Sequence, residues 1–216
     1  MGESRDSLIL VGCGGHGRVV LDSLLAAGFA DIRIVDPALE SNSNIFGKPV
    51  VAETILETEL RKSSVALVLG VGATGTISRR NAILRKYSEL GGAFQGVIHP
   101  TVYVGRESQV DISAQLLAGV ILQSRVRIAM NCVVNTGVRI DHDCVVESSS
   151  FIGPGTVLCG GVSIDRDVFV GAGAVIAPGV KIGSGARIGA GAVVLDDVSS
   201  NMTMVGNPAA PLKSQT

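Results

Sequence analysis

The chain has 216 residues, of which 46% are hydrophobic, 3% are aromatic and 28 are glycine, and its formal net charge is -1. The near-neutral charge argues against a protein that binds nucleic acid or an anionic membrane surface, and the apolar content argues against disorder. No cationic, apolar leader precedes the first strand and no apolar run approaches the length of a membrane span, so we expect a cytoplasmic protein without membrane insertion.

The first motif is a glycine-rich turn. An aliphatic strand at residues 8–11 runs into Gly12-Cys13-Gly14-Gly15-His16-Gly17, a helical pattern follows, and a second strand at residues 32–35 ends at Asp36. This order and spacing match the fingerprint of dinucleotide-binding domains. Glycines in such a turn let backbone N–H groups and the helix N-terminus approach a phosphate. They can also serve only to make a tight turn, and His16 can be a helix cap.

The remaining N-terminal segments predict one half of a Rossmann domain. We expect a helix near residues 53–61, strands at 65–71 and 94–98, and a helix at 78–90, which gives a βαβαβ domain over residues 1–97. One half suits a nucleotide diphosphate better than a nicotinamide cofactor. Ligands of such sheets lie at the carboxyl ends of the strands, so the candidate substrate-binding residues are Gly14, Gly15, His16, Asp36 and Gly72.

An aliphatic residue recurs at every sixth position from Ile98 to Ser199, which makes 17 hexads. The fifth position of each hexad is small or β-branched. Such a pattern predicts a parallel β-helix, in which three hexads form one coil of 18 residues and two side chains per hexad point inward. We assign this domain to residues 98–199 and a C-terminal tail to residues 200–216. The pattern itself does not define the hand of the helix.

His142 is the one histidine inside the repeats, and it is flanked by Asp141 and Asp143. Its place in the hexad is close to a corner of the coil. A carboxylate bonded to one ring nitrogen fixes the tautomer and raises the basicity of the other, as a general base requires. A polar residue is ordinary at this position of a hexad, so a plain surface histidine is the alternative.

The whole chain resembles the nucleotide-sugar acetyltransferases that include bacillosamine and perosamine N-acetyltransferases and sialic acid O-acetyltransferases. The matching motifs are Gly12 to Gly17, Ile98-His99-Pro100, Asn135-Thr136-Gly137, Asp141 to Cys144, Gly160-Gly161-Val162 and Val205 to Ala209. This resemblance implies a left-handed β-helix and a homotrimer, with acetyl-CoA as co-substrate in the groove between neighbouring chains. We expect no metal site.

The resemblance also implies roles for individual residues. His142 would be the catalytic base, Asp143 would orient its imidazole, and Asn135 would line the acceptor pocket. One coil after His142 comes Gly160, which leaves room for a thioester. The expected cofactor-binding residues are Gly160, Gly161, Ala172, Ala190 and Pro208.

The leading hypothesis is therefore an acetyl-CoA-dependent N-acetyltransferase whose partner is a nucleotide-linked amino sugar. One alternative is O-acetylation of a sialic-acid-like sugar, and another is a non-catalytic trimer that only binds nucleotide sugars. A zinc lyase of the carbonic anhydrase type would need three converging imidazoles, whereas His16 and His99 lie outside the repeat interior.

Overall fold

The computed structural model describes residues 7–61 and 65–212, which form two compact units. The first unit extends to Gly72 and also includes Ser78–Val97, and the second combines Ala73–Ile77 with the chain from Ile98 onward. Within the described ranges, every helix is too short or too polar to cross a lipid bilayer.

The first unit contains a three-stranded parallel sheet with the strand order β2-β1-β5. Its elements are β1 (Ser7–Val11), α1 (Gly15–Ala26), β2 (Asp31–Val35), β3 (Asn44–Ile45), β4 (Lys48–Pro49), α2 (Thr54–Arg61), β5 (Ala66–Leu69) and α3 (Ser78–Glu89). The strands form because their aliphatic residues are buried on both faces of the sheet, as is usual for parallel sheets. This confirms the predicted half-Rossmann domain.

The predicted strand at residues 94–98 is wrong as a single element. Phe94 makes one isolated parallel bridge to Leu67, and a separate strand, β6 (Val97–Ile98), belongs to the second unit's sheets. The reason is that Ile98 occupies the first position of the first hexad. β6 therefore pairs with β9 (Gln115–Leu116), which follows 18 residues later.

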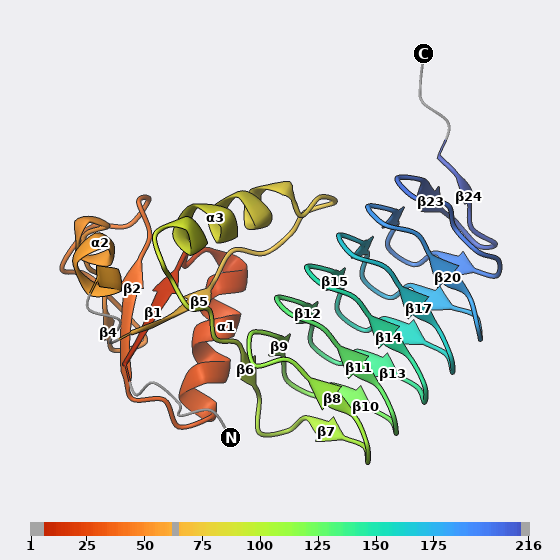
Figure 1. Cartoon of the computed structure of the whole chain (residues 1–216), viewed down its shortest axis with the longest axis horizontal. Coiled ribbons are helices and arrows are strands. Elements are labelled where there is room, and N and C mark those ends of the chain that lie inside the picture. Colours follow the sequence, from red (N-terminus) through yellow and green to blue (C-terminus); the bar gives the residue numbers. More distant parts are fainter. Residues whose placement is uncertain (1–6, 62–64, 213–216) are drawn as a thin grey trace. The chain divides into compact units, whose positions relative to one another are not determined.

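The second unit is a parallel β-solenoid with three flat faces, and its coils follow one another from green to blue in Figure 1. The first face contains β7 (Tyr103–Val104), β10 (Ile121–Leu122), β13 (Arg139–Ile140), β16 (Val157–Leu158), β19 (Val175–Ile176) and β22 (Val193–Val194). The second face contains β8 (Gln109–Val110), β11 (Arg127–Ile128), β14 (Val145–Val146), β17 (Ser163–Ile164) and β20 (Lys181–Ile182). The third face contains β6, β9, β12 (Val133–Val134), β15 (Phe151–Ile152), β18 (Phe169–Val170), β21 (Arg187–Ile188), β23 (Thr203–Val205) and β24 (Ala210–Pro211).

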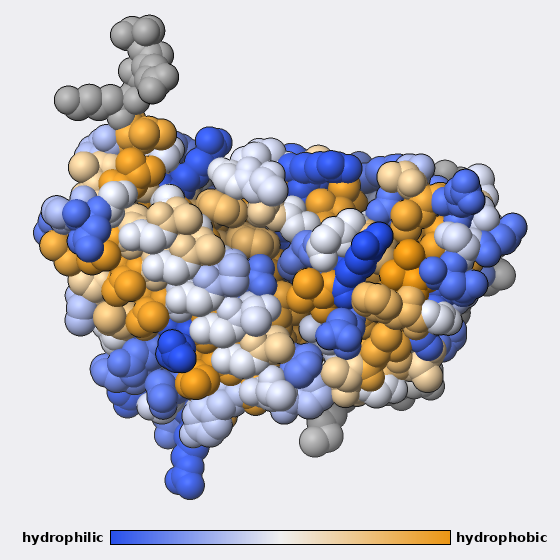
Figure 2. All heavy atoms as spheres, turned by 180° about the vertical axis from the view of Figure 1, so that it is seen from behind, coloured by the Kyte–Doolittle hydropathy of each residue, from blue (hydrophilic) through white to orange (hydrophobic). Residues whose placement is uncertain are grey.

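The coil period is 18 residues, as the hexads predict. Ile140, for example, pairs with Leu122 in the coil before it and with Leu158 in the coil after it. The first and fifth positions of the hexads form one continuous buried core. Seen from the side in Figure 2, the solenoid shows rows of weakly polar and apolar residues, and strongly hydrophilic side chains gather toward the edges.

The 18-residue period is not kept in the last coil, so the expectation that regular hexads continue to Ser199 is wrong there. Ile182 bridges to Val198, which is only 16 residues away, whereas the paired residues of earlier coils are 18 apart. The Asp197 carboxylate accepts a hydrogen bond from the Lys181 backbone N–H (2.7 Å) and so replaces a ladder carbonyl. The antiparallel pair β23 and β24 then ends the solenoid.

A short segment of the second unit covers part of the third face. Ile77, in Ala73–Ile77, packs in one buried cluster with Val133 and Phe151. The rings of Phe151 and Phe169 stack with their centroids 5.6 Å apart. The side chain of Phe151 is therefore part of the packing on this face.

Candidate active site

His142 lies at the corner where the first face of the solenoid turns into the second. We call this the first corner, and its successive coils contribute residues 106–107, 124–125, 142–143, 160–161 and 178–179. Backbone hydrogen bonds hold the coils in register, from the Asp143 N–H to the Ser124 carbonyl (3.1 Å) and from the Gly161 N–H to the His142 carbonyl (2.8 Å). The side chains at this corner therefore stand in a rigid column.

The carboxylate of Asp143 engages the imidazole of His142, with Oδ2 and Nδ1 2.7 Å apart. Hydrogen bonds from Arg125 and, less strongly, from His142 lower the pKa of Asp143 to about 2. Asp143 is then ionised near neutral pH and can only accept, so Nδ1 carries a proton, and in the neutral imidazole Nε2 presents its lone pair. Asp141 plays another part, because its Oδ1 accepts the backbone N–H of His142 (2.8 Å).

The Nε2 edge of His142 lies against Gly160 in the next coil. A Cβ on Gly160 would be 2.6 Å from Nε2 and 2.7 Å from Cε1, so any larger residue would displace the ring. The backbone N–H of Gly160 has no hydrogen-bond partner within the described chain. The Nε2 edge of the imidazole thus lies against a residue whose N–H is available to a ligand, an arrangement that could serve acyl transfer.

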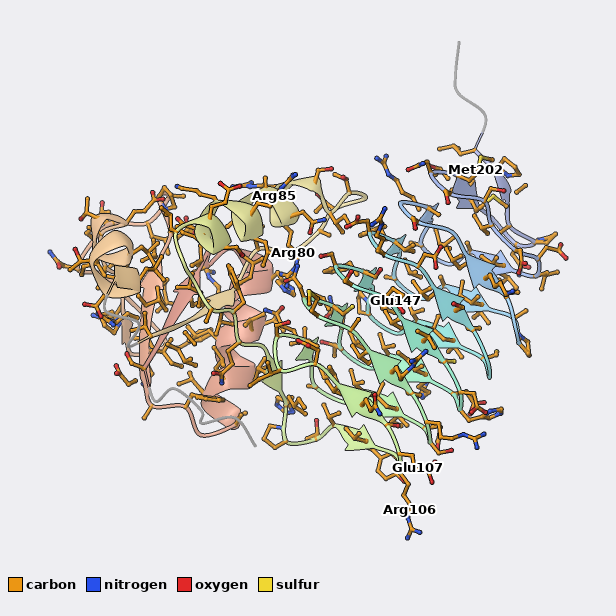
Figure 3. The ribbon with its side chains drawn as sticks, in the orientation of Figure 1. Arg80, Arg85, Arg106, Glu107, Glu147 and Met202 are labelled. Carbon is orange, nitrogen blue, oxygen red and sulfur yellow. The ribbon has the colours of Figure 1, made fainter. Side chains whose placement is uncertain are left out.

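Arg125 joins this cluster, although the sequence pattern did not predict it. Its Nε donates to Oδ1 of Asp143 at 2.7 Å, so the two oxygens of one carboxylate engage Arg125 and His142. Subtracting one period of 18 residues from Asp143 gives Arg125, and that arithmetic was the available signal. Figure 3 labels Arg106 and Glu107, which project from this corner in the coil before Arg125.

The remaining solenoid residues predicted for the site lie at two different corners. Gly161 is at the first corner beside His142, whereas Ala172 and Ala190 are at the third corner, between the third and first faces. Asn135 precedes β13 and His142 follows it, so these two residues lie at opposite edges of the first face. One chain does not bring the predicted acceptor, cofactor and base residues together.

Asn135 and Pro208 are two further predicted residues of the second unit. The side chain of Asn135 accepts the N–H of Thr136 (2.8 Å), which orders the turn around it. Pro208 is exposed in the connection between β23 and β24, and the adjacent Ala209 donates its N–H to the Val193 carbonyl (2.8 Å).

In the first unit, the glycine-rich turn joins the carboxyl end of β1 to α1. Gly14 and Gly15 are exposed, and a Cβ on either would meet nothing within 4 Å. Gly17 has a packing role, because a Cβ there would overlap the Gly12 carbonyl oxygen. Gly14 and Gly15 therefore leave the N-terminus of α1 open to a ligand.

The other predicted residues of this unit surround the same turn. Asp36 accepts the Cys13 N–H at Oδ2 (2.7 Å) and the Ala38 N–H at Oδ1 (2.9 Å), so it ties the turn to the end of β2. Gly72 lies against His16, since a Cβ there would be 2.8 Å from the His16 Cβ. The structure thus brings His16, Asp36 and Gly72 to one edge of the sheet.

A hollow of about 510 Å³ on the second face does not include the predicted site residues. It is lined by residues such as Gln109, Arg127, Met130 and Glu147. Across residues 7–61 and 65–212, no three His, Cys, Asp or Glu side chains are grouped in the way a metal ion would need.

Comparison with known proteins supports the resemblance noted in the sequence. Residues 7–87 match the PglD N-terminal domain, and residues 143–177 and 161–196 match the bacterial transferase hexapeptide repeat. PerB from Caulobacter crescentus, solved in complex with CoA and GDP-perosamine, is 31% identical, with a TM-score of 0.85 and coverage of 96% of this chain and 97% of its own.

Two more solved structures share the fold along the whole chain. The acetyltransferase domain of PglB from Neisseria gonorrhoeae, in complex with acetyl coenzyme A, is 30% identical (TM-score 0.88), with 97% of this chain and 100% of that domain covered. WeeI from Acinetobacter baumannii is 24% identical (TM-score 0.83), with 95% and 99% covered. The chain belongs to the PglD-type family of hexapeptide-repeat acyltransferases, together with PerB and the PglB acetyltransferase domain.

Proposed function

We propose that this protein transfers an acetyl group from acetyl-CoA to the amino group of a nucleotide-linked amino sugar, with His142 as the general base. The observation that carries the proposal is the pairing of His142 Nδ1 with Asp143 at 2.7 Å while Nε2 faces Gly160. PerB was solved with CoA and GDP-perosamine, and the PglB domain with acetyl coenzyme A, which supports both substrate classes.

The first unit would hold the nucleotide end of the acceptor. Open backbone at Gly14 and Gly15 and the N-terminus of the 12-residue helix α1 suit the negative charge of a diphosphate. His16, Asp36 and Gly72 surround that position. Since Asp36 already accepts two backbone N–H groups, its main contribution would be to shape the turn.

The chemistry is direct transfer in a ternary complex. The acceptor amine attacks the thioester carbonyl and forms the N–C bond, while Nε2 of His142 removes a proton from the nitrogen. The Gly160 N–H stabilises the oxyanion of the tetrahedral intermediate. As that intermediate collapses, the C–S bond breaks and the imidazolium returns its proton to the leaving CoA thiolate. Atoms and charge balance without an acyl-enzyme.

We propose that the active form is a homotrimer in which neighbouring chains complete the site. Asn135, Ala172 and Ala190 lie across the first face from His142, so a second copy is needed to bring their corner to His142. The pantetheine arm would run past the small residues Gly160, Gly161, Ala172 and Ala190, with Pro208 near its far end. The exposed glycines of the third corner, such as Gly155 and Gly173, have nothing within 4 Å of a built Cβ and leave space for it.

A screen of UDP-, GDP-, dTDP- and CMP-linked amino sugars for acetyl-CoA-dependent thiol release tests this function. We expect release with at least one acceptor, an acetylated amine as product, and loss of release in His142→Ala. Acetylation of a hydroxyl acceptor would instead identify an O-acetyltransferase. Calorimetry that finds sugar-nucleotide binding without acetyl-CoA binding would identify a non-catalytic sensor.

A further inference from the structure

The carboxylate of Asp143 is a bridge between two coils of the solenoid. Its Oδ2 is 2.7 Å from Nδ1 of His142, and its Oδ1 is 2.7 Å from Nε of Arg125. Both oxygens are therefore engaged, and the carboxylate cannot rotate without breaking one contact. The orientation of the imidazole thus depends on a residue one coil earlier.

The backbone fixes this arrangement. Asp143 donates its N–H to the carbonyl of Ser124, the residue before Arg125, so the two corner turns stack directly. Arg125 and Asp143 have the same left-handed backbone, with φ of 59° and 62°. Their side chains consequently leave the corner along neighbouring, parallel paths.

Arg125 occupies a backbone position that does not favour arginine. The later residues of the same column, Gly161 and Gly179, are glycines with φ of 70° and 74°. In the rest of the described solenoid, the left-handed residues other than glycine are short and polar, apart from Glu107; they are Asn131, Asp143, Ser149, Asp167 and Asn201. Asn and Asp tolerate this region, whereas a long side chain is strained in it.

Stability does not explain the arginine. The side chains of Arg125 and Asp143 are 61% and 38% exposed, and ion pairs exposed to this degree contribute little to folding. A strained backbone held for a weak surface pair indicates a role other than stability. The contact partner indicates which role, because Asp143 is the residue that holds His142.

We propose that Arg125 is a positioning residue for the imidazole of His142, holding one oxygen of Asp143 so that the other meets Nδ1. This inference rests on the proposed role of His142 as base. The charged groups near Arg125 are Asp143, which accepts its hydrogen bond, and Glu107, whose negative charge acts on it from the preceding coil. Asp141 bonds the backbone of His142 in the same turn.

The contact with Arg125 also sets the charge state of the carboxylate. Arg125 is the main reason that the pKa of Asp143 falls to about 2, so the carboxylate stays an acceptor wherever the enzyme works. Removing Arg125 should therefore free the carboxylate to rotate and disorder its pairing with the imidazole.

The test compares Arg125→Gly and Arg125→Lys with wild type, and with Asp167→Gly as a matched control at another left-handed corner residue (φ 62°). We expect Arg125→Gly to melt at or above the wild-type temperature, since glycine suits this backbone. Its kcat should fall about tenfold with both KM values unchanged, because the base is misplaced. Arg125→Lys should recover part of the rate, and Asp167→Gly should retain the wild-type rate.

A second measurement, ¹⁵N NMR, excludes a merely structural role. In Arg125→Gly, the ¹⁵N signals of the neutral His142 imidazole should show a mixture of tautomers in place of the Nδ1–H form alone. Wild-type kcat and wild-type NMR signals in Arg125→Gly would overturn the inference. If His142→Ala is inactive in the same assay, that result would leave the proposed function intact, whereas an active His142→Ala would overturn both.

Discussion

The Nε2 edge of His142 lies against the backbone of Gly160, one coil later, where a Cβ would come within 2.6 Å of the ring nitrogen. The solenoid period creates this contact. It places the imidazole beside the Gly160 N–H, which has no hydrogen-bond partner within the described chain.

Gly160→Ala should lower kcat about 100-fold, because the added methyl group pushes the imidazole out of line with the acceptor. The backbone of Gly160 is not left-handed, so alanine adds no backbone strain. Steady-state kinetics with both substrates would measure the effect. In a His142→Ala background the methyl group has no ring to displace, so any fall in melting temperature should disappear. A Gly160→Ala enzyme with wild-type kcat would contradict the contact.

Asp143→Asn should lower kcat roughly 100-fold, since a neutral amide can neither hold the Nδ1–H tautomer as firmly nor stabilise the imidazolium. The pKa of Asp143, about 2, lies below its ordinary value, so the carboxylate stays ionised as pH falls until that value is approached. Between pH 5 and 9, every transition in the wild-type pH–rate profile should therefore also occur in the profile of Asp143→Asn. A transition that is present in wild type and absent in Asp143→Asn would show that Asp143 titrates in this pH range.

The 18-residue period of the solenoid explains how much of this site could be predicted from sequence. The 18-residue period places Gly160 beside His142, and the regular core residues, such as Ile140 and Leu158, keep the period exact enough for that inference. The same arithmetic relates Arg125 to Asp143, but their contact depends on the directions of the two side chains, which no pattern specifies. The shortened last coil was missed because a side-chain oxygen of Asp197 replaces a backbone partner there.

Gly72→Ala should raise the KM for the nucleotide sugar about tenfold and leave the KM for acetyl-CoA unchanged, because a Cβ at Gly72 would lie 2.8 Å from the His16 Cβ and displace it. Calorimetric titration with the nucleotide sugar would report the same loss. Equal changes in both KM values would show that the turn is not an acceptor site.

Tyr87→Phe should lower the free energy of unfolding by about 1 kcal/mol at neutral pH, because the Tyr87 hydroxyl donates to Glu53 at 2.7 Å. Burial, and then the bond to Glu53, raises the pKa of Tyr87 to about 12, above its usual value near 10. The tyrosine's contribution is therefore fully present below pH 10 and is lost as pH rises toward 12. Urea denaturation at pH 9 and at pH 11.5 should show the difference between wild type and variant shrinking, and a constant difference would contradict this.

The most direct test of the central claim is the rate of acetyl transfer by His142→Ala, measured with saturating acetyl-CoA and the nucleotide sugar that wild type accepts. We predict that the rate falls by about 10² to 10⁴, the usual contribution of a general base, while calorimetry shows both ligands still bound and light scattering shows an unchanged oligomer. A rate within about threefold of wild type would contradict the assignment of His142 as the base.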